Sequence, residues 1–183
     1  MYDLPFLSLK SIDYNSIMLY IITGLPFSGK STFAKELVRR YGFERTSVDK
    51  MMNKRHLDAP NMTQKDWNLV YSEAYGELES LLKAGKTVVF DGGSLLKSER
   101  NTIKSIAEKY GVSWKLIYIN TSIEEIAHRR KKNLVSQERD QLSDETMDKA
   151  FEMFEEPTPD ENYITYDQSV NLDKWIDENI AVK

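Results

Sequence analysis

The chain has 183 residues, of which 40% are hydrophobic and 30% charged, and a formal net charge of -4. This length is typical of one domain, and the hydrophobic fraction is large enough to form a buried core. The chain has no cysteine and two histidines, which excludes disulfides and a cysteine nucleophile and argues against a zinc enzyme. No hydrophobic run approaches the roughly 18 residues of a membrane span, so we expect a soluble, cytoplasmic protein.

Hydrophobic patterning predicts strands that alternate with helices in one domain, residues 18–183, after an N-terminal extension at residues 1–17. Because helices supply the crossovers between parallel strands, the expected fold class is α/β, a three-layer sandwich with a mostly parallel sheet. Ligands bind such sheets at the C-terminal ends of the strands. In chain order, the expected elements are a strand at 17–23, a helix at 30–41, a strand at 44–48, a loop to about residue 62, a helix at 64–84, a strand at 87–91, a helix at 100–110, a strand at 115–119, a helix at 122–134, a helix at 147–154, a strand at 163–166 and a helix at 172–180.

A phosphate-binding motif stands between the first strand and the first helix. Residues 24–31 match the P-loop pattern G-x-x-x-x-G-K-[ST] at every fixed position. Its glycines allow the backbone to form a concave set of N–H donors, and the following helix adds its positive dipole end. We expect Lys30 to contact the β- and γ-phosphates and to act in catalysis, and the Ser31 hydroxyl to bind Mg²⁺. The predicted nucleotide-binding residues of the loop are Gly24, Leu25, Pro26, Phe27, Ser28, Gly29, Lys30, Ser31 and Thr32.

The expected nucleotide is ATP. A GTPase carries an Asn-Lys-x-Asp motif after a strand, but the Asn-Lys pair at residues 53–54 is followed by Arg55 and His56. The length of the chain suits a small kinase, so we expect phosphoryl transfer with ATP and Mg²⁺ as cofactors.

Two aspartates follow predicted strands. Asp91 ends the hydrophobic run 88–90 and is predicted to hold Mg²⁺ directly or through water, with a turn-capping role as the alternative. Asp49 ends the strand at 44–48 and is predicted to be the general base that takes the proton of the acceptor hydroxyl. The alternative for Asp49 is an N-cap for a helix at 50–55.

The densest positive run is His-Arg-Arg-Lys-Lys at residues 128–132. The hydrophobic stripe that begins at Ile123 continues to Arg130 and Leu134, so Arg130 is predicted to point inward. An inward arginine needs an anion, and we predict that Arg130 neutralises the transferred phosphate and that Arg129 contacts the nucleotide, in a lid over the site. A solvated helix face is the alternative for both.

Three further side chains are candidates for the acceptor pocket. Arg100 opens the helix at 100–110 and is on its hydrophobic stripe, and an exposed helix start is the alternative. Trp67 and Tyr71 are on the long helix at 64–84, where core packing is the alternative.

These motifs resemble a group of small P-loop kinases that includes zeta-toxin-like kinases, chloramphenicol phosphotransferase and the kinase domain of bacteriophage polynucleotide kinase. The resemblance covers about residues 18–167 and implies a P-loop NTPase (nucleoside-kinase-like) fold with five parallel strands and the phosphate-loop strand in the centre. It implies Asp49 as base, Asp91 near magnesium, and Arg129 or Arg130 in the lid. The segments that carry it are 24–32, Ser47-Val48-Asp49, Val89-Phe90-Asp91, the arginine-rich segment 126–133, and Phe151-x-x-Phe154-Glu155-x-Pro157-x-Pro159-Asp160-Glu161.

The sequence departs from this group at two positions. In polynucleotide kinases an arginine that grips the substrate phosphate lies three residues after the base, where this chain has Met52. Phe27 stands where the group usually has glycine. We therefore expect a kinase that phosphorylates a hydroxyl of a small molecule. The alternatives are a polynucleotide 5′-hydroxyl kinase and a non-enzymatic ATP-binding switch or interaction module.

Overall fold

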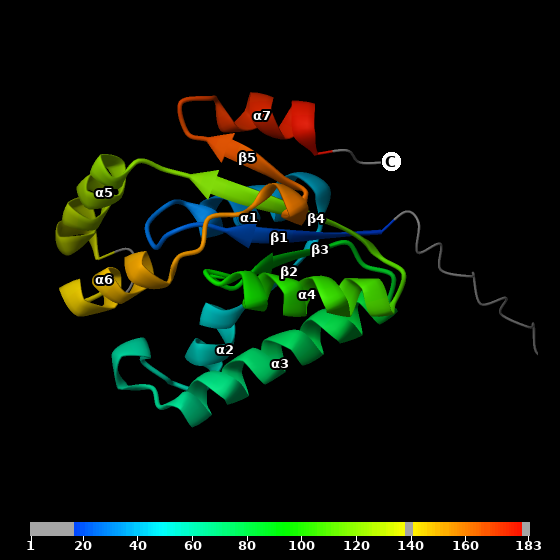
Figure 1. Ribbon diagram of the computed structural model, residues 1–183, viewed down its shortest axis with the longest axis horizontal. Coiled ribbons are helices and arrows are strands. Elements are labelled where there is room, and N and C mark those ends of the chain that lie inside the picture. The colour runs from blue at the N-terminus through cyan, green and yellow to red at the C-terminus, as the bar shows by residue number, and fades with distance from the viewer. Residues whose placement is uncertain (1–16, 138–140, 181–183) are drawn as a thin grey trace, which may run out of the picture.

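Five parallel strands form one sheet of order β2-β3-β1-β4-β5 in the computed structural model, which describes residues 17–137 and 141–180 (Figure 1). The phosphate-loop strand β1 is central, and the expected α/β fold class is confirmed. Most of the expected N-terminal extension lies outside the described residues, but Ile17 is buried in the core. The strands are β1 (Met18–Thr23), β2 (Glu44–Ser47), β3 (Val88–Asp91), β4 (Ser113–Asn120) and β5 (Tyr163–Asp167).

Helices connect the strands and cover both faces of the sheet. Among the described residues, no helix is both long enough and hydrophobic enough to cross a membrane. The segment expected to be a loop before residue 62 contains a short helix, which begins at Val48 because Ser47 ends β2 and caps the helix. The helices are α1 (Lys30–Tyr41), α2 (Val48–Lys54), α3 (Gln64–Lys83), α4 (Lys97–Lys109), α5 (Ile123–Ser136), α6 (Asp144–Met153) and α7 (Leu172–Asn179), with 3-10 turns η2 (Ala59–Asn61) and η3 (Pro159–Glu161).

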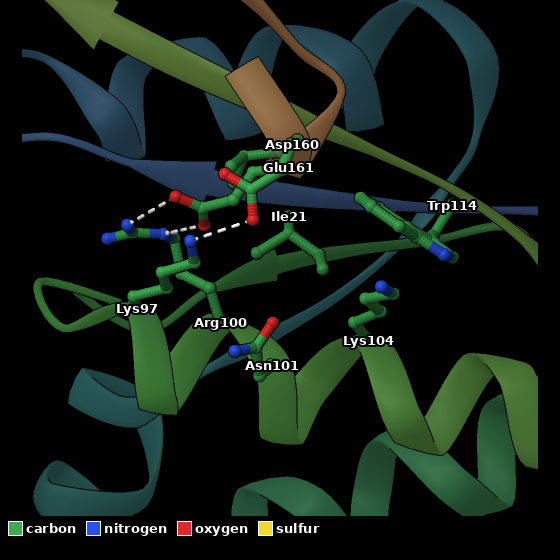
Figure 2. Close-up of a pocket in the computed structure, with 9 residues that line it drawn as sticks. Ile21, Lys97, Arg100, Asn101, Lys104, Trp114, Asp160 and Glu161 are labelled. Carbon is green, nitrogen blue, oxygen red and sulfur yellow. Dashed lines mark hydrogen bonds and ion pairs between the residues drawn. The ribbon is translucent and has the colours of Figure 1, made fainter. Parts of the chain in front are cut away.

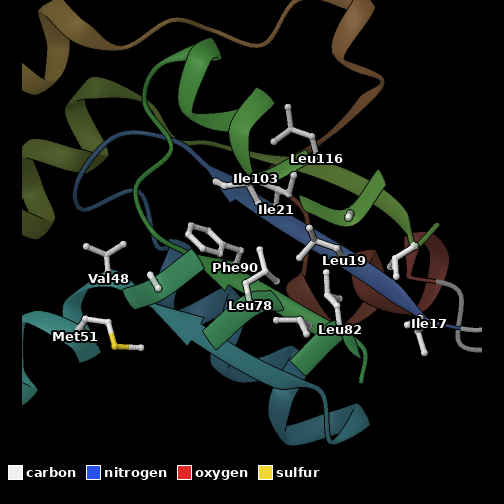
Figure 3. Packing of buried hydrophobic residues seen from close by; sticks show 14 of the residues in the cluster. Ile17, Leu19, Ile21, Val48, Met51, Leu78, Leu82, Phe90, Ile103 and Leu116 are labelled. Atoms are coloured by element: carbon white, nitrogen blue, oxygen red, sulfur yellow. The ribbon is translucent and has the colours of Figure 1, made fainter. Parts of the chain in front are cut away.

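The alternation of side chains along the strands divides the core into two layers. Leu19 and Ile21 of β1 face α3 and α4, whereas Tyr20 and Ile22 face α1 and α7. Figure 3 shows the first of these layers, in which side chains from β1 and β3 meet those of α3 and α4. Because both faces are covered, the strands are hydrophobic along their whole length, as parallel strands usually are.

The remaining helices α5 and α6, called the lid here, lie beyond the end of the sheet to which the strands point (Figure 1). The lid contacts the phosphate loop through a small cluster in which Phe27 packs with Ile126 and Met147. The hydrophobic cluster of the lid is distinct from the two core layers that cover the sheet.

The predicted inward stripe of α5 is correct at Ile126 and wrong at both ends. Ile123 and Leu134 are 63% and 62% exposed, whereas Ile126 and Asn133 are buried. The reason is that α5 packs on the phosphate loop rather than on the broad face of the sheet. The helix therefore buries only a narrow strip of its surface. Hydrophobicity alone does not determine which side of such a helix faces inward.

Candidate functional site

The phosphate loop leaves β1 at Thr23, whose hydroxyl donates to the carbonyl of Ser94 at 2.7 Å. Two glycines then adopt backbone conformations that favour glycine, Gly24 at φ 145° and Gly29 at φ 102°. A Cβ atom on Gly24 would lie 2.7 Å from the carbonyl oxygen of Ile119, so this position has no room for a side chain. The loop therefore folds tightly between β1 and α1.

The interior of this loop is positive. The Nζ atom of Lys30 curls back and donates to the carbonyls of Gly24 and Leu25 at 2.7 and 2.8 Å. The amide of Phe33 makes the first bond of α1, to Gly29 at 3.0 Å, so the amides before it stand at the helix N-terminus without an intrahelical acceptor. This donor set, with one ammonium group and a helix dipole, fits a chain of phosphates.

Arg129 lies against the same loop from the lid. Its Nη1 atom donates to the carbonyls of Ser28 at 3.0 Å and Phe27 at 3.3 Å. Its Nε atom is held by Glu125 at 2.7 Å, and Gln168 contacts both the guanidinium and the Ser28 carbonyl. The structure therefore places Arg129 on the lid and against the phosphate loop.

Arg130 points elsewhere. Its Nη2 atom donates to Asp144 at 2.6 Å and to the carbonyl of Leu142 at 2.9 Å, which joins α5 to α6. The expectation that Arg130 faces the transferred phosphate is therefore corrected, because the rotation of α5 gives that direction to Arg129.

Asp91 ends β3 next to the phosphate loop, as expected, but it has a partner that the sequence did not suggest. Its side chain is 4% exposed, and its Oδ2 atom accepts from Nη2 and Nε of Arg45 at 2.5 and 3.0 Å. Arg45 comes from the neighbouring strand β2. The signal that could have found Arg45 is physical: a buried carboxylate at the end of a strand needs a nearby cation.

The part of the cleft beside Ser31 and Asp91 fits a magnesium ion only together with a nucleotide. Ser31 and Asp91 line the same cleft, but among the described residues no three carboxylate or histidine side chains gather closely enough to hold a metal ion. Mg²⁺ in kinases is typically held by one or two protein oxygens together with phosphates and water. The residues present therefore fit a nucleotide-bound magnesium, and Ser31 and Asp91 are the side chains that could hold it.

Asp49 is exposed in the first turn of α2, not at a strand tip. Ser47, not Asp49, caps this helix, because its Oγ atom accepts from the amide of Lys50, so the N-cap alternative for Asp49 is wrong. Since Ser47 pairs in register with Asp91, Asp49 and Asp91 emerge at the same edge of the sheet.

The aromatic candidates of α3 line the same cleft, and they also pack against the core, as the alternative predicted. The rings of Trp67 and Tyr71 lie 6.2 Å apart, and the Tyr71 hydroxyl donates to the carbonyl of Gly92 at 3.2 Å. Burial raises the pKa of Tyr71 well above its usual value, and the charges of Glu99 and Asp49 raise it further. Tyr71 is thus a neutral hydroxyl at neutral pH.

Arg100 does not face the acceptor pocket, and its assignment is corrected. The side chain is 2% exposed, and its Nε and Nη2 atoms lie 2.6 and 2.9 Å from the carboxylate of Glu161 (Figure 2). Its Nη1 atom donates to the carbonyls of Ser94 and Leu95. Arg100 and Glu161 therefore lock the segment before β5 onto α4, beside a small cavity of about 80 Å³.

One large cleft of about 2390 Å³ joins these groups. The phosphate loop and the lid form one end, and α2 and α3 form the other. The predicted site residues that line it are Pro26, Phe27, Gly29, Lys30, Ser31, Thr32, Asp49, Trp67, Tyr71, Asp91 and Arg129. Arg45 and Glu99 also line it, and the sequence analysis missed both.

The parallel sheet with β1 in the centre, the loop that follows it and the lid define a P-loop kinase-like fold. The chain belongs to the AAA domain family, whose model matches residues 19–157.

Solved structures of the same fold include kinases and nucleotide complexes. The Mycobacterium tuberculosis APS kinase CysC in complex with AMPPNP and APS is 18% identical, with a TM-score of 0.64 over 91% of this chain and 96% of that one. A gluconokinase from Sinorhizobium meliloti 1021 is 15% identical, with a TM-score of 0.63 over 90% of each chain. Chaetomium thermophilum Kti12 in complex with ADP-AlF3 is 19% identical, with a TM-score of 0.67 over 87% of this chain and 97% of that one. At these identities the likeness shows the fold.

Proposed function

We propose that this protein is an ATP- and Mg²⁺-dependent kinase that transfers the γ-phosphate to a hydroxyl of a small molecule. The observation that carries this proposal is the shared cleft, in which the phosphate loop faces Asp49 across the end of the sheet. The structures of similar fold include a gluconokinase and an APS kinase, which supports phosphoryl transfer to a small acceptor.

Each group of site residues has a separate role in the proposed reaction. The amides that begin α1 and the ammonium group of Lys30 hold the phosphates, and Arg129 adds positive charge at the lid side. Ser31 and Asp91 would hold a magnesium ion, which would neutralise part of the negative charge on the phosphates when bound. Asp49 takes the proton of the acceptor hydroxyl as the new oxygen–phosphorus bond forms and the bond to the ADP oxygen breaks.

The polynucleotide kinase alternative has less support. Met52 lines the cleft where the related kinases have a phosphate-gripping arginine. Of the nearby cations, Lys54 and Arg55 do not line the cleft, and Lys50 is paired with Glu77 at 2.7 Å. Within residues 17–137 and 141–180, the arginine that lines the cleft on β2, Arg45, is bonded to Asp91, so this side of the cleft offers no uncommitted arginine comparable to that of the polynucleotide kinases.

The proposal is tested by transfer of labelled γ-phosphate from ATP to the low-molecular-weight fraction of a cell extract. The variant Asp49→Asn removes the base, and we expect labelled product to fall by about 10²–10⁴-fold. Asp148→Asn makes the same change at an exposed residue outside the cleft and serves as the matched control, with product formation close to that of the wild type.

Calorimetry separates binding from transfer. We expect Lys30→Ala to abolish the heat of ATP binding, and Asp49→Asn to leave it intact. Tight ATP binding without labelled product on any acceptor, including a 5′-hydroxyl oligonucleotide, would refute the kinase proposal and favour the non-enzymatic switch.

A further inference from the structure

The end of the cleft opposite the phosphate loop has an aromatic wall, which we define as Trp67, Tyr71 and Tyr75 of α3. The ring centroids of neighbouring members lie 6.2 and 5.9 Å apart, and Tyr75 stacks on Phe90 at 6.0 Å. All three members are partly buried and line the cleft. A row of rings on one helix face favours an occupant with a flat or hydrophobic body.

The cations that line the cleft on β2 and α2 are already neutralised. On β2, α2, α3 and the segment after β3, all within the described residues, the cleft is lined by two basic side chains, Arg45 and Lys50. Arg45 is bonded to Asp91 at 2.5 Å, and Lys50 to Glu77 at 2.7 Å. An acceptor that carries a phosphate, sulfate or carboxylate group would have to break one of these pairs to gain a counter-charge.

Two carboxylates, those of Asp49 and Glu99, line the cleft together with Tyr71. Asp49 approaches from α2 and Glu99 from α4, and both act electrostatically on the Tyr71 hydroxyl. The Oε2 atom of Glu99 accepts from the amide of Leu96 at 3.0 Å, which holds the carboxylate at the start of α4. Aromatic faces beside carboxylates form an environment that attracts cations and repels anions.

We infer that the acceptor is an ammonium-bearing alcohol with an aromatic or hydrophobic body, an assignment that rests on the proposed function. The body packs on the aromatic wall, the hydroxyl approaches Asp49, and the ammonium group lies beside Glu99. Glu99 is then a specificity-determining residue, and it separates this site from those that receive anionic acceptors.

Three matched probes test the charge preference in the absence of ATP: 2-amino-1-phenylethanol, 1-phenylethane-1,2-diol and mandelate. Each carries a phenyl ring and a hydroxyl, and they differ in a terminal ammonium, hydroxyl or carboxylate group. Binding is followed by the fluorescence of Trp67, and Trp67→Phe identifies the part of the signal that comes from the cleft. We expect the amine to bind at least fivefold more tightly than the diol, and mandelate to bind most weakly.

The variant Glu99→Gln removes the charge and keeps an oxygen that accepts from the Leu96 amide, so α4 retains its N-terminal hydrogen bond. We expect it to weaken binding of the amine about fivefold and to change binding of the diol less than twofold. Glu108→Gln, on the same helix but outside the cleft, is the matched control.

Mandelate binding as tightly as the amine would overturn the inference. An unchanged amine affinity in Glu99→Gln, or no Trp67 response to any probe, would also overturn it. These binding measurements contain no ATP, so a negative result contradicts the inferred acceptor class and does not bear on the proposed kinase activity. Absence of labelled product in the transfer assay contradicts the kinase activity and does not bear on the binding preference.

Discussion

Arg45 of β2 reaches across to β3 and holds the carboxylate of Asp91 at 2.5 Å, directly beside the phosphate loop. The pair joins two neighbouring strands at the edge where the cleft opens. The side chain of Asp91 is 4% exposed and that of Arg45 is 25% exposed, so the carboxylate depends on this guanidinium for its counter-charge.

Removal of the guanidinium is expected to destabilise the fold. Arg45→Met leaves a buried carboxylate uncompensated, and we expect the free energy of unfolding to fall by about 2 kcal/mol, less than for a fully buried pair because water reaches Arg45. Urea unfolding measures the change. Arg39→Met removes an arginine that is 68% exposed and is expected to cost less than about 1 kcal/mol. Equal losses in the two variants would contradict the prediction, whereas the double variant Arg45→Met/Asp91→Asn should recover part of the loss.

The buried pair of Arg100 and Glu161 predicts a dependence of stability on pH. Burial raises the pKa of Glu161, but the hydrogen bonds from Arg100 and from the amide of Thr158 outweigh it, so the net pKa is lowered below its usual 4.5. A carboxylate with a lowered folded-state pKa stabilises the fold above its unfolded-state pKa. This contribution is therefore present above about pH 4.5 and is lost as the pH falls through the lower folded-state value.

Glu161→Gln makes this contribution measurable. At pH 7 we expect the variant to be less stable than the wild type by about 3 kcal/mol, because Arg100 becomes a buried cation without a counter-charge. The difference should shrink as the pH is lowered below 4.5. Glu178→Gln, in an exposed pair, is the control and should show almost no difference at either pH. A Glu161→Gln deficit that stays constant from pH 7 to pH 3 would rule out the linkage.

Substitution of the two neighbouring arginines of the lid is expected to have very different effects on the rate of phosphoryl transfer. Arg129 lies on the phosphate loop and Arg130 on Asp144, so Arg129→Ala should lower the rate of phosphoryl transfer by about 10³-fold, the lower end of the effect of arginine fingers. Arg130→Ala should change stability by less than about 1 kcal/mol and leave transfer nearly intact. Single-turnover rates with labelled ATP compare the two. The reverse order of effects would show that α5 rotates when substrate binds.

At position 27, glycine is expected to give a more stable protein than alanine, which is the reverse of the usual order within a helix. The φ of 62° at Phe27 is left-handed, while its ring packs in the lid cluster with Ile126 and Met147. Phe27→Ala and Phe27→Gly both lose this packing, but only glycine relieves the backbone, so Phe27→Gly should be the more stable by about 1 kcal/mol. In α1, Phe33→Gly should instead be less stable than Phe33→Ala by about the same amount. Thermal unfolding of the four variants measures these differences. If glycine and alanine have the same order of stability at both positions, the prediction is refuted.

Much of the fold follows from local patterning. The hydrophobic runs at β1, β3 and β4 and the periodic stripe of α3 are strong because each of these elements lies in a core layer. The P-loop motif likewise depends on consecutive residues, so the strand, the loop and the helix that hold Lys30 were predictable together. The short helix α2 was predicted only as an alternative, at 50–55 with Asp49 as its cap, because it has only seven residues and its true N-cap, Ser47, also ends a strand.

The sequence by itself determined the parallel α/β architecture, the phosphate loop and the two aspartates beside it. Only the tertiary structure decided which arginine faces the loop, because Arg129 and Arg130 differ by one step of a helix whose rotation is set by Phe27 and Asp144. The partners of Asp91 and Arg100 were equally hidden. Pairs such as Arg45 with Asp91 join residues 46 positions apart, and Arg100 with Glu161 joins residues 61 apart. Such contacts arise when parallel strands and their crossovers close the fold, and no local pattern records them.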